Sequence, residues 1–118
     1  MLKIKRAYEP ATKADGYRVL VDRLWPRGRK KEQLALNEWA KVLAPSSKLR
    51  KFFAHDPKRW ETFQSRYQRE LHSSAEAIEK LHALTQLARK GTVTLIYSAH
   101  DEDYNQAVAL KKVIDGQE

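Results

Sequence analysis

The stretch YRVLVDRLWPRGRKK at residues 17–31 decides the fold and marks the candidate site. Its first half contains the apolar, β-branched run VLV at 19–21, which predicts a buried strand. Its second half contains Pro26, which cannot donate a ladder hydrogen bond, and Gly28, which permits a positive φ. We therefore expect the strand to end near Asp22 and to deliver a polar loop to the rim of a sheet.

The bulk composition predicts a soluble cytoplasmic protein with one domain over residues 1–118. No apolar run is long enough to span a membrane, and the first residues lack the apolar segment of a signal peptide. Cysteine is absent, so disulfides are not expected. The net charge of +8 favours an anionic partner, although it is equally compatible with charge that serves only solubility.

Alternating strands and helices predict an α/β fold, a single layered domain with a small, mostly parallel sheet flanked by helices. Strands are expected at 2–6, at 19–22, at 36–42 and at 92–97, the last being the strongest and central. The loop at 7–16 is short for a parallel crossover. The first two strands are therefore either antiparallel, or parallel without a helix between them.

Helices are predicted from caps and apolar spacing. Ser46–Ser47 starts one, Asp56 caps a second with Pro57 at its first position, and Ser73 with Glu76 forms the capping box of a third. A last helix is expected at 103–115. Segment 33–43 has helical spacing but also suits a strand, and we predict a helical turn at 30–35 followed by the strand at 36–42.

Three segments are expected at the carboxyl rim of a parallel sheet, at 22–28, 44–47 and 98–105. Arginine binds phosphate or carboxylate through two N–H groups, a helix start offers free backbone N–H groups, and tryptophan can stack on a base. The candidate ligand-binding residues are Arg23, Trp25, Arg27, Gly28, Ser46, Ser98 and Asn105. The competing interpretation is a solvated basic face in which Asp22 forms a structural ion pair.

The candidate acid–base residues are Asp22, Asp101 and His55, although Asp101 is better explained as a helix cap. The pairs His55-Asp56 and His100-Asp101 suggest a metal-dependent phosphohydrolase, but such a site needs more ligands. Neither a Walker loop nor a dinucleotide or zinc motif occurs, so we expect no metal and no cofactor.

Several runs resemble the YeaO-like family, a branch of the domain-of-unknown-function family 488. They are DGYRVLVDRLWPRG at 15–28, APS at 44–46, LRKFF at 49–53, HDPxxW at 55–60 and VTLIYSA at 93–99. The resemblance covers nearly the whole chain and implies a cytoplasmic α/β domain without an assigned activity or catalytic residues. Members often have Asn-His-Ala where this chain has Asn105-Gln106-Ala107, which argues against a metal or proton-transfer role at Gln106.

Two functions remain open. One is an enzyme or binding domain for a small anionic ligand at the rim, which we favour because the rim includes carboxylates and seryl caps that nucleic acid would not need. The other is a nucleic-acid-binding module that uses the loop at 23–31, in which five of nine residues are basic. A protein-interaction domain has no positive sequence feature.

Overall fold

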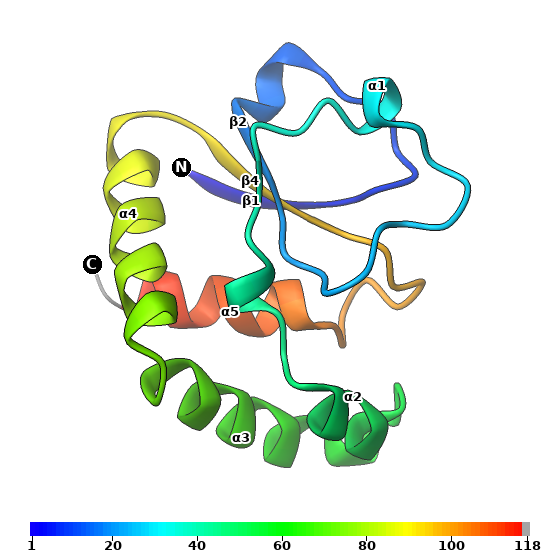
Figure 1. The fold of residues 1–118 in the computed structure, drawn as a ribbon, viewed down its shortest axis with the longest axis vertical. Coiled ribbons are helices and arrows are strands. Elements are labelled where there is room, and N and C mark those ends of the chain that lie inside the picture. The colour runs from blue at the N-terminus through cyan, green and yellow to red at the C-terminus, as the bar shows by residue number, and fades with distance from the viewer. Residues whose placement is uncertain (117–118) are drawn as a thin grey trace.

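Strand β4 (Val93–Tyr97) lies at the centre of the sheet in the computed structural model, which describes residues 1–116 (Figure 1). It pairs on either side with β1 (Leu2–Arg6) and β2 (Tyr17–Leu20), and β3 (Glu38–Trp39) pairs with β2. The strand order is β1-β4-β2-β3, and every pairing is parallel. The predicted α/β fold with a small parallel sheet and a central β4 is therefore confirmed.

The first two strands do not touch each other, because β4 lies between them. They are parallel and are joined without an α-helix, through a loop that contains only the 3-10 helix η1 (Lys13–Asp15). The turn into β2 depends on Gly16, which has a φ of +63°. A Cβ atom on Gly16 would lie 2.2 Å from the Thr92 carbonyl oxygen, so the close approach to β4 excludes any larger residue.

Alternation along β4 divides the core into two parts. Val93, Leu95 and Tyr97 belong to a large cluster that includes the buried side chains of the helices, whereas Ile96 belongs to a small cluster with Leu34. The four helices of the large cluster are α2 (Ser47–Phe53), α3 (Trp60–His72), α4 (Ala75–Lys90) and α5 (Gln106–Asp115). The short α1 (Lys31–Leu34) contributes Leu34 to the small cluster.

The predicted boundaries need five corrections. β2 spans Tyr17–Leu20 rather than 19–22, so it ends two residues before Asp22. β3 has two residues rather than seven, because the chain turns into the 3-10 helix η2 (Lys41–Leu43). Asp56 caps a 3-10 helix, η3 (Pro57–Arg59), and α3 follows it. Ser74 rather than Ser73 accepts the capping hydrogen bond of α4. α5 begins at Gln106 with Asn105 as its cap, so the acidic residues at 101–103 precede it.

A buried ion cluster joins β1, η1 and β2. The Asp15 carboxylate accepts hydrogen bonds from Arg18 at 2.6 Å and from Lys5 at 3.1 Å, and also from the backbone and hydroxyl of Thr12. The Nε of Arg18 donates to the Leu34 carbonyl at 2.9 Å. Burial alone would raise the pKa of Asp15, but these hydrogen bonds hold it at about 2.

Within residues 1–116, each helix is too short or too polar to cross a membrane.

Candidate functional site

A cleft of roughly 660 Å³ opens at the carboxyl end of the sheet. Its walls come from the loop after β2, from α2 and the turn that follows it, and from the segment after β4, which lie toward the right of Figure 1. Parallel strands bring their carboxyl ends to one edge, which is why segments distant in the sequence meet here. Polar and charged lining residues are Tyr8, Asp22, Arg23, Arg27, Ser47, Arg50, Lys51, His55, Ser98, His100 and Gln106.

Asp22 is the most deeply buried charged residue of the cleft, with 7% of its surface exposed. Its Oδ2 accepts hydrogen bonds from the Ser98 backbone N–H at 2.9 Å and the Ser98 hydroxyl at 2.5 Å, and its Oδ1 accepts one from Gln106. Burial raises the pKa of Asp22, opposed by these hydrogen bonds and by the charge of Arg50. Asp22 thus links the loop after β2 to β4 and α5.

Positive charge dominates the rest of the cleft. Arg23, Arg27, Arg50 and Lys51 line it, and among the described residues Asp22 is the only acidic one that does so. Arg23 donates a long hydrogen bond of 3.4 Å to the Pro45 carbonyl. In the part of the chain that the structure describes, no hydrogen bond or ion pair engages the side chains of Arg27, Arg50 or Lys51. The cleft therefore carries an excess of cationic groups available to an anion.

The loop after β2 is held in place by hydrogen bonds from side chains to backbone carbonyls, and two of the donors lie within it. The bonds are Trp39 to Asp22 at 2.7 Å, Trp25 to Arg29 at 2.7 Å, Tyr8 to Arg27 at 2.9 Å and Arg29 to Ala7 at 3.0 Å. A loop fixed before binding loses little entropy when a ligand arrives. The loop therefore forms one side of the cleft in a conformation that these hydrogen bonds fix.

The turn after α2 carries backbone strain beside the cleft. Ala54 and His55 both adopt the left-handed region, with φ of 45° and 57°. For residues other than glycine this costs of order 1–3 kcal/mol each. The strain places His55 against the cleft, with its ring centroid 6.1 Å from that of Phe53.

The structure brings most of the predicted site residues together. Those that line the cleft are Asp22, Arg23, Trp25, Arg27, His55 and Ser98. Four others lie outside its lining: Gly28, Ser46, Asp101 and Asn105. Gly28 has a φ of +77°, which a glycine adopts easily, and no heavy atom lies within 4 Å of the position that a Cβ would take. Its role is therefore to allow the backbone conformation of the turn.

The three polar residues outside the cleft have structural partners. Ser46 caps α2, and its N–H and hydroxyl both donate to Glu70, so a carboxylate of the chain already occupies this anion position. Asp101 accepts the N–H groups of residues 103 and 104 in a turn. Asn105 is buried, accepts from the Val108 N–H, and donates to the Asp101 carbonyl.

The predicted site residues do not include Ser47, Arg50, Lys51 and Gln106, which also line the cleft. Arg50 and Lys51 do belong to the basic residues after the seryl cap that suit a phosphate or carboxylate. Ser47, Arg50 and Lys51 have the spacing i, i+3 and i+4, which places them on one face of α2, and this spacing could have identified them. Gln106 follows the α5 cap, and the sequence alone does not reveal that it meets Asp22.

Two further observations concern the rest of the surface. Among residues 1–116, no group of three or more His, Asp or Glu side chains is placed to hold a metal ion. A second, more open hollow of roughly 690 Å³ lies at β3, lined by Trp25, Leu36, Trp39 and neighbouring residues. Its charged residues are Lys31, Glu32 and Glu38, so it lacks the excess of one charge that the cleft has.

Comparisons with known proteins identify the family of the chain. A family model described as "Inactive DUF488-N3 subclade" matches residues 1–117. The chain is similar to the uncharacterised protein YeaO of Escherichia coli (strain K12), with 45% identity over 92% of each chain. It is also similar to the uncharacterised protein Rv3073c of Mycobacterium tuberculosis, with 37% identity over 98% of this chain and 94% of the relative. No solved structure matches the chain significantly.

Proposed function

The chain belongs to the DUF488-N3i family, whose model is described as an inactive DUF488-N3 subclade, and on that premise we propose that its cleft binds a small anion without chemically altering it. The anion carries a phosphate or a carboxylate, which are the groups that arginine binds with two N–H donors. The single observation that carries the proposal is the cationic wall formed by Arg27, Arg50 and Lys51, whose side chains have no ion pair among residues 1–116.

The surroundings of Asp22 favour binding over acid–base catalysis. Both carboxylate oxygens already accept hydrogen bonds, and the partner on Oδ1 is the Gln106 amide. An amide does not titrate near neutral pH, so this pair lacks the proton carrier that an Asp–His pair has. Asp22 instead fixes Ser98 and Gln106 at the base of the cleft.

Removing one cleft cation tests the proposal. Binding of inorganic phosphate, ribose 5-phosphate and citrate is measured by calorimetry at low salt. We expect at least one of them to bind, and Arg50→Gln to weaken that binding about tenfold or more, since a charge-assisted hydrogen bond contributes about 1.5–3 kcal/mol. Arg89→Gln, the same change in the last turn of α4, is the control and is expected to change affinity less than twofold. Absence of binding by all three anions, or equal losses in both variants, contradicts the proposal.

The alternative function, a nucleic-acid-binding module that uses the loop Arg23–Lys31, is supported by the exposed ring of Trp25 beside the basic residues. The concave cleft, with Asp22 at its base, fits a small ligand better than a continuous backbone. Binding of short single-stranded DNA or RNA that falls steeply with salt and is insensitive to Arg50→Gln would favour the alternative.

A further inference from the structure

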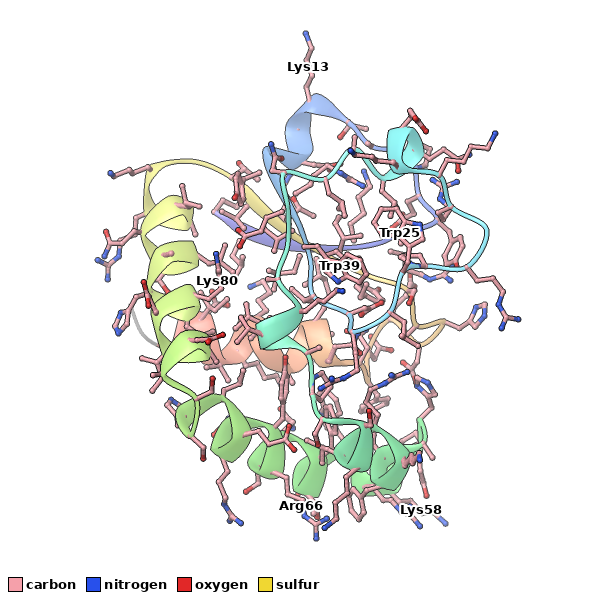
Figure 2. All side chains as sticks on the ribbon, viewed as in Figure 1. Lys13, Trp25, Trp39, Lys58, Arg66 and Lys80 are labelled. Atoms are coloured by element: carbon pink, nitrogen blue, oxygen red, sulfur yellow. The ribbon has the colours of Figure 1, made fainter. Side chains whose placement is uncertain are left out.

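Trp25 presents a fixed aromatic surface in the lining of the cleft. Its indole N–H donates to the Arg29 carbonyl at 2.7 Å, and its ring meets that of Trp39 edge-on, with centroids 5.5 Å apart and an interplanar angle of 64°. Figure 2 shows the two rings close together. Nevertheless 37% of Trp25 is exposed. Its polar atom is satisfied and its orientation is set, so the exposed part of the ring is an apolar surface ready for contact.

The cleft is larger than an anion alone requires. Hollows of about 300–1,000 Å³ hold ligands of drug size, and the cleft, at roughly 660 Å³, lies within this range. Beside its cations it has an apolar portion, lined by Leu24, Trp25, Pro26, Phe53 and Ala99. A ligand that fills it has an anionic end and a flat or apolar body.

We propose that this ligand is a nucleoside phosphate, whose phosphate lies among Arg27, Arg50 and Lys51 and whose base lies against Trp25. The inference rests on the proposed anion-binding function and adds the class of the ligand. Every nucleobase has an aromatic face that stacks on tryptophan, and the phosphate matches the cationic wall. No base-specific contact is part of the inference.

The polar bottom of the cleft suits the ribose of the nucleoside phosphate. The Gln106 amide donates to Asp22 through its nitrogen, and its oxygen accepts no hydrogen bond from the described residues. That oxygen is an acceptor for a ribose hydroxyl. The Ser98 hydroxyl donates to Asp22 and keeps lone pairs for a second donor from the ligand.

The experiment separates the base from the phosphate by comparing AMP, ribose 5-phosphate and adenosine in calorimetry at fixed salt. In the wild-type protein we expect AMP to bind on the order of tenfold more tightly than ribose 5-phosphate, because stacking on an aromatic side chain favours the base. Trp25→Leu is expected to remove this difference. Trp25→Phe keeps an aromatic face and is expected to retain most of it.

Tyr104→Leu is the matched control. Tyr104 is an aromatic residue with a similar exposure of 36%, but it packs against Trp60 and lies outside the cleft lining. We expect the variant to keep the full preference for AMP. Equal affinities for AMP and ribose 5-phosphate in the wild type, or an equal loss in Tyr104→Leu and Trp25→Leu, would overturn the nucleoside phosphate while leaving anion binding in place.

A ligand with a 5′-nucleoside phosphate could be free or at the end of a strand. A 5′-phosphorylated pentanucleotide and its 5′-hydroxyl counterpart distinguish these sources. Preference for the phosphorylated strand over AMP assigns the site to strand ends, and preference for AMP assigns it to free nucleotides. Failure of ribose 5-phosphate, AMP and both strands to bind would overturn the nucleoside phosphate. The proposed function itself would be contradicted only if inorganic phosphate and citrate also failed to bind.

Discussion

Asp15 is the residue whose ionisation most clearly supports the fold. It is 5% exposed and accepts hydrogen bonds from Lys5, Arg18 and Thr12, which hold its pKa at about 2 instead of the usual 3.8. A carboxyl with a lowered pKa adds stability above its unfolded pKa and loses it as the pH falls through its folded pKa. Asp15 therefore adds about 2 kcal/mol, which is lost between about pH 4 and pH 2.

Asp15→Asn tests this contribution. We expect the variant to lose about 3–5 kcal/mol at neutral pH, because Arg18 stays buried without its carboxylate. The difference in the free energy of unfolding between wild type and variant is expected to shrink as the pH falls from 4 to 2. Urea denaturation at several pH values measures it. A difference that stays constant over this range would show that a carboxyl other than Asp15 causes the loss of stability in acid.

Single residues were predicted well where a local rule applies. Asp22, Arg23 and Ser98 line the cleft because they lie within a few residues of a strand end, and strand ends are visible in the sequence. Arg27 lies further along the same loop after β2. Ser46 and Asp101 belong to segments that the sequence predicts at the same rim, but they lie outside the cleft lining. Their partners, Glu70 for Ser46 and the N–H groups of a turn for Asp101, are set by tertiary contacts and by one-residue shifts that periodicity does not resolve.

At the scale of elements, the turn that joins η1 to β2 gives a sharp prediction. Gly16→Ala is expected to cost roughly 3 kcal/mol or more, because the new methyl group would clash with the Thr92 carbonyl and the residue would keep a positive φ. Gly28→Ala is the matched control, with a positive φ but open surroundings, and is expected to cost about 1–2 kcal/mol. Equal losses in chemical denaturation would mean that strain alone, without the close approach, requires Gly16.

Elements with their own hydrophobic pattern were predicted from the sequence. The buried face of α3 has the spacing of an amphipathic helix, and β4 is a continuous β-branched and apolar run. β3 was predicted too long, because Leu36 and Val42 pack against different clusters although both are apolar. Apolar character alone does not predict which of the two hydrophobic clusters a residue packs against.

For the whole molecule, the sheet order predicts a gradient of local stability. β4 is buried and has partners on both sides, whereas β3 has two residues, lies at the edge and packs on the small cluster. In native-state hydrogen exchange we expect the amides of β4 to be the most protected and the Ala40 amide, which donates to Leu20, to exchange much sooner. Equal protection at Ala40 and in β4 would mean that β3 opens only with the entire sheet.

The sequence predicts a site at the carboxyl rim of a parallel sheet, but it does not reveal the strand order that brings the walls of the cleft together. Parallel pairing through β4 brings the ends of β1, β2 and β4 to one edge, where Tyr8, Asp22 and Ser98 meet. The loop at 7–16 left the relative direction of the first two strands open. Contacts made through a strand some 75 residues later decide it.

The insertion of β4 between β1 and β2 also has a consequence for synthesis on the ribosome. β1 pairs only with β4 among the described strands, so β1 has no strand partner until residues 93–97 have emerged. Throughout that interval its apolar side chains are open to chaperones and to other nascent chains. The full sheet can therefore assemble only after β4 has been synthesised, and the insertion of β4 between β1 and β2 completes both the core and the bottom of the cleft.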